Sequence, residues 1–141
     1  MAFSHPAIES WLGILVGSVP SFHTFRMAFH KLTQNGQVDA LREASKARPQ
    51  LIFKHSTRCS ISSMVWARVE ERLPELDAVI DIHFLDLIAH RTVSNYVADV
   101  LNERHESPQA LLLSGGEVIL EQSHMGVQPD ELLEEAQQAA V

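Results

Sequence analysis

The feature that most constrains the fold is an alternation, along the chain, of short apolar runs with stripes of helical spacing. Runs typical of buried strands lie at 51–53 and within 79–85. Apolar residues recur at helical spacing over 61–73, between these runs, and again over 93–101. Two strands joined through a crossover helix are expected to be parallel, with a right-handed connection. The pattern therefore predicts parallel strands with helices packed on them.

The remaining elements complete the sheet. A helix is predicted over 38–47, and two strands at 110–113 and 118–120 follow the last crossover. Gly115 and Gly116 lie between these two strands and supply the positive φ angles of a tight hairpin, so the two strands are antiparallel. Two further elements are expected, a small strand over 31–33 and a final helix that opens at Pro129. This order predicts an α/β three-layer sandwich, with a mixed central sheet and helices on both faces.

The amino-terminal segment differs from the rest of the chain. Residues 31–141 are predicted to form one domain and residues 1–30 an extension of uncertain order, with Met27 as an alternative start of the protein. The apolar run 11–19 is about half as long as the roughly 20 residues that a membrane-spanning helix needs. No Lys or Arg precedes Arg26, so the basic region of a signal peptide is missing. We therefore expect no membrane role.

Composition and charge exclude several classes of protein. Hydrophobic residues make up 45% of the chain and charged residues 21%, which is an ordinary globular mixture. With 11 Lys and Arg against 18 Asp and Glu, the formal charge of −7 disfavours a nucleic acid partner. Cys59 is the single cysteine, which excludes an internal disulfide and a cysteine-rich zinc site. One thiol is typical of a cytoplasmic protein rather than of a disulfide-stapled secreted one.

Cys59 lies where a predicted strand passes into a predicted helix. First-turn N–H groups and the positive end of the helix dipole stabilise a thiolate there, and the adjacent Arg58 adds to the effect. Because reactivity needs the thiolate, Cys59 is the candidate nucleophile; the alternative is an inert buried thiol. Ser62 stands three residues later, where a dithiol motif has its second cysteine. This monothiol arrangement predicts chemistry that stops at an intermolecular mixed disulfide.

Three blocks of sequence resemble one known family. They are 53–62 (Phe-Lys-His-Ser-Thr-Arg-Cys-Ser-Ile-Ser), 91–95 (Arg-Thr-Val-Ser-Asn) and 105–109 (His-Glu-Ser-Pro-Gln). They look like blocks of the YtxJ-like monothiol bacilliredoxins, redox proteins of the bacillithiol system, and the similarity runs from about residue 33 to residue 126. The resemblance implies a thioredoxin-like fold, which agrees with the predicted order of elements.

The resemblance also implies a reaction and a set of residues for it. Cys59 would attack the mixed disulfide between bacillithiol and a client protein, take up the bacillithiol and free the client's thiol. The implied substrate-binding residues are Thr57, Arg58, Ser60, Ile61 and Ser62 near the cysteine, and Ser107 and Pro108 opposite it. In thioredoxin-like folds the proline that faces the active cysteine is cis, and Pro108 matches that position. Relatives often have proline where this chain has Ser60, so their redox values do not transfer.

The implied partners are bacillithiol as thiol co-substrate, S-bacillithiolated client proteins and a regenerating thiol reductase system, with no bound cofactor. Because bacillithiol has a malate unit, we expect its carboxylates to meet the helix N-terminus, Arg58 and Lys54. Two other functions stay open. One is activity on another small thiol such as glutathione, and the other is a non-catalytic redox-sensing adaptor.

Eight histidines raise the question of a metal or hydrolytic site. None of them forms a His-x-His, His-x-x-x-His or His-Glu-x-x-His pattern, so no metal site is predicted. His55, four residues before Cys59, is the one histidine expected close to the thiol. A cysteine–histidine hydrolase would also need an orienting third group and a substrate pocket, for which the sequence gives no signal.

Overall fold

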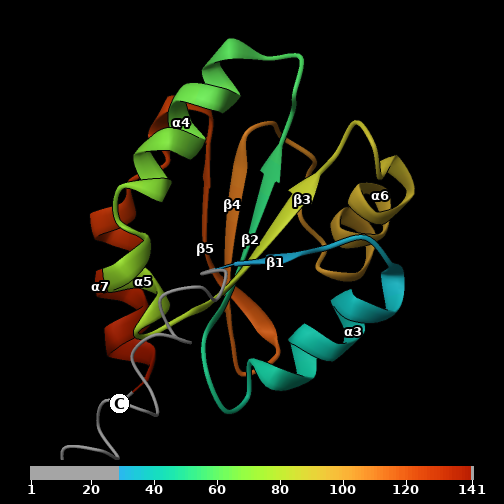
Figure 1. Cartoon of the computed structure of the whole chain (residues 1–141). Helices are drawn as coiled ribbons and strands as arrows, with labels where there is room; N and C mark the ends of the chain where they lie inside the picture. Colours follow the sequence, from blue (N-terminus) through green and yellow to red (C-terminus); the bar gives the residue numbers. More distant parts are fainter. Residues whose placement is uncertain (1–28, 141) are drawn as a thin grey trace, which may run out of the picture.

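A five-stranded sheet in the order β1-β3-β2-β4-β5 forms the centre of the computed structural model (Figure 1). The structure describes residues 29–140. The strands are β1 (His30–Lys31), β2 (Gln50–His55), β3 (Asp81–Asp86), β4 (Gln109–Ser114) and β5 (Glu117–Ser123). β1 and β2 are parallel to β3, whereas β4 is antiparallel to both of its neighbours, β2 and β5. The predicted mixed sheet is therefore confirmed.

Helices cover both faces of this sheet (Figure 1). They are α3 (Asn35–Ala44), α4 (Ser60–Glu70), α5 (Leu73–Asp77), α6 (Arg91–Val100), α7 (Pro129–Ala139) and a short 3-10 turn, η1 (His124–Gly126). α4, α5 and α7 lie on one face, and α3 and α6 lie on the other. The α/β three-layer sandwich predicted from the alternation is confirmed.

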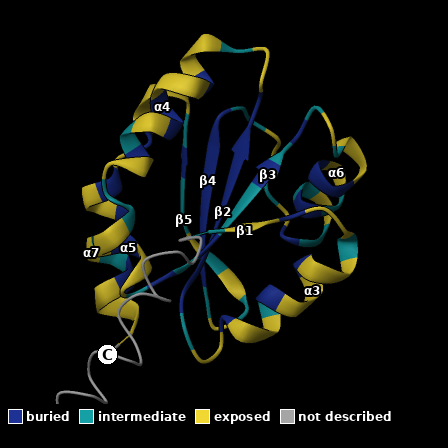
Figure 2. Ribbon diagram, viewed as in Figure 1, coloured by how far each residue is buried: buried dark blue, intermediate teal, exposed yellow. Residues whose placement is uncertain are grey.

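The central strand β2 is buried along its whole length (Figure 2). Leu51 and Phe53 pack toward α4 and α7, while Ile52 packs on the opposite face, toward α3 and α6. Helices on both faces explain why the sequence of this strand is a continuous apolar run rather than an alternation. Each fully buried side chain of this size contributes roughly 1.5–3 kcal/mol to folding.

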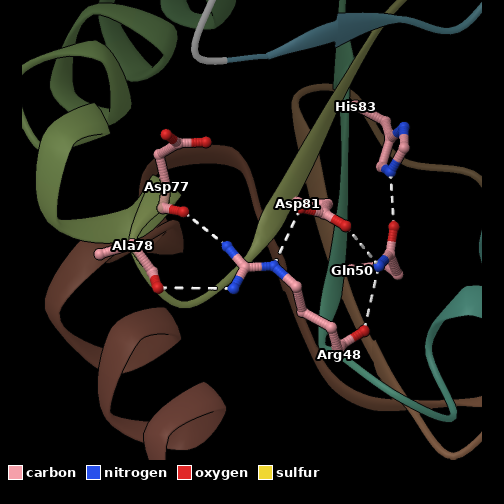
Figure 3. Close-up of polar contacts among 6 residues, drawn as sticks. All are labelled: Arg48, Gln50, Asp77, Ala78, Asp81 and His83. Carbon is pink, nitrogen blue, oxygen red and sulfur yellow. Dashed lines mark hydrogen bonds and ion pairs between the residues drawn. The ribbon is translucent and has the colours of Figure 1, made fainter. Parts of the chain in front are cut away.

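A polar network closes the amino-terminal end of β2 (Figure 3). Arg48 donates from Nε to Asp81 Oδ1 (2.9 Å) and from Nη2 to the Asp77 carbonyl (2.6 Å). The Gln50 side-chain amide donates both of its protons, to the Arg48 carbonyl and to Asp81 Oδ2, each at 3.0 Å. Its oxygen is therefore an acceptor, and His83 donates to it from Nε2 at 2.8 Å.

Two local features differ from the sequence-based expectations, and a third expectation is not tested. β1 is two residues long and begins at His30, one residue before the predicted strand 31–33. The helical spacing over 61–73 is divided between α4, which ends at Glu70, and α5, which begins at Leu73 and has Pro74 in its first turn, where its missing N–H removes no helical hydrogen bond. The predicted extension 1–30, apart from its last two residues, and the alternative start at Met27 lie outside the described residues.

Two further expectations concern the hairpin and the membrane. Gly115 and Gly116 have φ angles of 65° and 87° between β4 and β5, as the predicted hairpin requires. Among the described residues, none of the helices has the length and apolar character needed to cross a membrane.

Candidate active site

Cys59 is the N-cap residue of α4, at the point where the chain leaves β2. Its backbone N–H donates to the Ser56 carbonyl (3.2 Å), and its carbonyl accepts from Ser63 N–H (3.2 Å). Its side chain makes no capping hydrogen bond and is partly exposed, which leaves the sulfur accessible to a second molecule. An N-cap side chain lies next to the unpaired first-turn N–H groups of its helix.

The loop before Cys59 is fixed on its buried side by hydrogen bonds that involve His55 and Ser62. Ser62 is fully buried, and its Oγ accepts from Ser56 N–H at 3.0 Å. The same oxygen lies 2.8 Å from Nδ1 of His55, the last residue of β2. Burial lowers the pKa of His55, although Asp86 and Glu70 act in the opposite direction, so this histidine is neutral at neutral pH. Ser62 therefore faces the protein interior and supports the loop.

The remaining residues predicted near the cysteine are exposed at the start of α4 or just before it. Thr57, Arg58 and Ser60 are all solvent-exposed, and Ile61 retains 42% of its surface. Met64, one turn further along α4, is 50% exposed, and Met125 of the adjacent η1 is 46% exposed. Exposed polar residues and exposed apolar side chains therefore both occur near the start of α4 and on the adjacent η1.

The Ser107–Pro108 segment directly precedes β4, which pairs with β2, so it lies at the same end of the sheet as the Cys59 loop. The peptide bond between Ser107 and Pro108 is cis. Pro108 is buried, and its carbonyl accepts from His124 N–H at 2.8 Å. Ser107 Oγ is buried and has no hydrogen-bond partner among residues 29–140. A buried hydroxyl without a partner is uncommon in folded proteins.

Lys54 does not lie where the sequence suggested. It was expected to meet a carboxylate of the substrate directly, but its side chain is fully buried on the α6 side of β2. Its Nζ lies 2.8 Å from Nδ1 of His105, and Ser94 Oγ lies 3.5 Å from the same nitrogen. The expectation was wrong because a residue in the middle of a sheet covered on both faces cannot extend into solvent.

The charge on this lysine is partly suppressed by its surroundings. Burial and, to a smaller extent, the Arg91 guanidinium lower the pKa of Lys54 to about 8, against the opposing effect of the Glu106 carboxylate. Burial and the charges of Lys54 and Arg91 also lower the pKa of His105. Glu106 itself is paired with His124, its Oε1 lying 2.9 Å from Nε2. Lys54 is therefore largely an ammonium at neutral pH, beside a neutral imidazole.

The role of His105 was missed because its position carries no local signal. Its block resembled the family, but neither spacing nor periodicity links it to Lys54, which lies 51 residues away. A lysine directly after an apolar strand run was the available signal, because such a residue must find a partner when it is buried. Within residues 29–140, no three His, Cys, Asp or Glu side chains gather in a group that could hold a metal ion.

Comparisons with solved structures agree with this architecture. The chain is similar to a protein whose description assigns it a thioredoxin fold, with a TM-score of 0.67, 29% identity and coverage of 78% of this chain and 94% of that one. It is also similar to the thioredoxin of Malassezia sympodialis (TM-score 0.62, 15% identity, 82% and 94% coverage). The thioredoxin of Fasciola hepatica gives a TM-score of 0.62 at 14% identity, with 79% and 99% coverage.

The comparison with protein families is more specific than these structural likenesses. The model of the monothiol bacilliredoxin family BrxC matches residues 30–132, which include β1 to β5, Cys59 and the Ser107–Pro108 segment. The fold and this match together make the protein a thiol redox protein. With a thioredoxin fold, one cysteine at the start of α4 and a match over most of its length, the chain belongs to the monothiol bacilliredoxin family.

Proposed function

We propose that this protein removes bacillithiol from S-bacillithiolated client proteins through a mixed disulfide on Cys59. The observation that carries the proposal is a single, partly exposed thiol at the N-terminus of α4 in a chain of the monothiol bacilliredoxin family. The position three residues later holds a buried serine, so the chain offers no resolving thiol there. The reaction must then be completed by a thiol from another molecule.

The chemistry proceeds in two exchanges. The Cys59 thiolate attacks the bacillithiol sulfur of the mixed disulfide, the old S–S bond breaks, and the client leaves as a thiolate that takes up a proton. A second bacillithiol thiolate then attacks the bacillithiol sulfur on Cys59, which releases bacillithiol disulfide and restores the Cys59 thiolate. A reductase system subsequently reduces that disulfide, and no cofactor bound to this protein is required.

Other residues are assigned to the two partners of the exchange. Thr57, Arg58 and Ser60 would face the small thiol, with Arg58 meeting its carboxylates. The exposed side chains of Ile61, Met64 and Met125 would offer apolar surface to the client protein. Ser107 and Pro108 would contact the bound thiol from the opposite side. Because the reaction needs a pool of reduced thiols and the chain has one cysteine, we place it in the cytoplasm.

The test is intact mass spectrometry of the full chain after exposure to a bacillithiolated model protein, with Cys59→Ser as control. We expect one bacillithiol on Cys59, an equal amount of free thiol on the model protein, and no transfer to the variant. Transfer from a glutathionylated protein but not from the bacillithiolated one would replace bacillithiol with glutathione. A lack of transfer from both would leave the redox-sensing adaptor as the function.

A further inference from the structure

We propose that His105, held in one tautomer by Lys54, is a specificity-determining residue that donates a hydrogen bond from Nε2 to a carboxylate of the small thiol. The proposal rests on the thiol-exchange function proposed above. It adds a group that distinguishes carboxylate-bearing thiols from neutral ones, and it assigns a role to a buried lysine that the exchange chemistry itself does not use.

The first step is the direction of the Lys54–His105 hydrogen bond. An ammonium group can only donate, so the nitrogen that it contacts, Nδ1 of His105 at 2.8 Å, must be the acceptor. In a neutral imidazole the proton is then on Nε2. Ser94 Oγ, 3.5 Å from Nδ1, can also donate to it and therefore favours the same tautomer. Lys54 in this way fixes which ring nitrogen of His105 is a donor.

The second step is that this donor remains free. The His105 residue is solvent-exposed, and no side chain or carbonyl within residues 29–140 accepts a hydrogen bond from its Nε2. Lys54, in contrast, is fully buried and has no carboxylate within ion-pair distance in the described part of the chain. The lysine thus contacts the imidazole from inside the protein, while the free N–H of the ring is available to a ligand.

The third step is the place and the charge of this donor. His105 lies two residues before Ser107 in the loop that enters β4, at the end of the sheet that also holds Cys59. Lys54 and Arg91 of α6 bring positive charge to this corner, and Glu106, the acidic group that acts on it, is paired with His124. The positive charges of Lys54 and Arg91 beside His105 are complementary to an anionic thiol.

The experiment compares two mixed disulfides of one model protein, made with bacillithiol and with 2-mercaptoethanol, which has no carboxylate. Because the client is the same, the ratio of the two exchange rate constants reports only on the small thiol. We expect His105→Asn to lower this ratio about tenfold. His105→Gln, whose amide nitrogen lies near the position of Nε2, should restore most of the loss. An equal effect of His105→Asn on both substrates would show a structural role and overturn the proposal.

Lys54→Met tests whether Lys54 holds His105 in one neutral tautomer. In the wild type, burial and the charges of Lys54 and Arg91 hold the pKa of His105 below its ordinary value, so the ratio should change less between pH 7.5 and 5.5 than in the variant. Without the charge of Lys54, His105 can take up a proton as pH falls, and the ratio in Lys54→Met should rise about threefold, with Arg91 and Glu106 unchanged in both proteins. A flat pH profile of the ratio in the variant would refute this role of Lys54, provided that circular dichroism shows the variant to be folded.

A third disulfide separates this inference from the proposed function. Glutathione also carries carboxylates, so exchange with glutathione but not with bacillithiol would end the bacillithiol assignment. His105→Asn should then still lower the ratio of glutathione to 2-mercaptoethanol. A wild type that exchanges with 2-mercaptoethanol but with neither carboxylate-bearing thiol would overturn the inference.

Discussion

The polar residues at the two ends of β2 are of similar kinds but differ in whether their hydrogen bonds are made within the protein. At the amino-terminal end, the side-chain amide of Gln50 donates both of its protons and accepts at its oxygen, so that it joins the groups around it in one network (Figure 3). At the carboxyl-terminal end, Ser107 Oγ is buried without a partner among the described residues, and the Cys59 side chain makes no capping bond. The amino-terminal end of β2, called the closed end below, makes its hydrogen bonds within the protein. The carboxyl-terminal end, called the open end, leaves groups available to a second molecule.

The difference shows how one strand can provide both stability and reactivity. A buried polar group whose hydrogen bonds are all made inside the protein contributes to folding, whereas one left without a partner costs stability until a ligand binds it. We therefore expect substitutions at the closed end to change stability with little effect on exchange. Substitutions at the open end should change the exchange reaction, and one of them should even raise stability.

The largest expected effect is a loss of stability in acid, through His83 at the closed end. Burial, together with the charge of the neighbouring His30, lowers the pKa of His83 to about 4, while Asp81 opposes them. Between pH 6.5 and 4 the unfolded chain therefore binds more protons at this residue than the folded chain does. Stability is full above pH 6.5 and falls as the pH drops to 4, by as much as about 3 kcal/mol.

Urea unfolding of wild type and His83→Gln at pH 7.5 and 4.5 measures this effect. The variant should lose less stability on acidification than the wild type. A residual pH dependence is expected in both, because the pKa values of His55 and His105 are lowered in the same direction. An identical loss in the two proteins would contradict the assignment to His83.

Gln50→Leu should cost about 2 kcal/mol of stability. The substitution leaves His83 Nε2–H and the Arg48 carbonyl without their partner at a position that is 1% exposed. Chemical denaturation measures the loss, with Gln138→Leu on the exposed surface of α7 as matched control. The exchange rate per folded molecule should be the same as in the wild type. A large drop in that rate would show that the closed end also affects the exchange reaction.

Ser62→Ala should act at the open end, with a stability cost of about 1 kcal/mol and a several-fold slower exchange. The substitution removes the oxygen that accepts from Ser56 N–H and contacts His55 Nδ1, so the loop that holds Cys59 loses its support. Ser63→Ala, at the next and exposed position, is the control. If the two variants exchange at the same rate, Ser62 has no part in positioning the thiol.

Lys54→Met should give the smallest change, a gain of about 0.5–1 kcal/mol at pH 7. The pKa of this lysine falls from 10.5 to about 8 on folding, so burying its charge opposes folding at neutral pH, and the hydrogen bond from Nζ to His105 Nδ1, which the variant loses, offsets most of that cost. The wild type recovers stability as pH rises from 8 to 10.5, because the unfolded chain still binds a proton that the folded chain has released. Thermal melts should therefore show the gain shrinking above pH 8; a loss at pH 7 would contradict it.

The sequence alone predicted the positions of the main elements and of the nucleophile. Apolar runs and helical stripes are local patterns, and burial enforces them, so β2, α4 and α6 were found within a few residues. Gly115-Gly116 predicted its hairpin because positive φ angles are needed there. The position of Cys59 followed from the order of strand and helix, since the N-cap residue is by definition the one before the first turn.

The tertiary structure alone decided what the polar residues around that nucleophile do. Lys54 directly follows an apolar run, and only packing of both helical layers on β2 shows that it cannot reach solvent. Its partner His105 comes from a distant loop, and Ser62 turns toward His55 rather than outward. Local sequence limits the backbone and the pattern of burial, whereas the partner of a buried polar group depends on which segments the fold brings together.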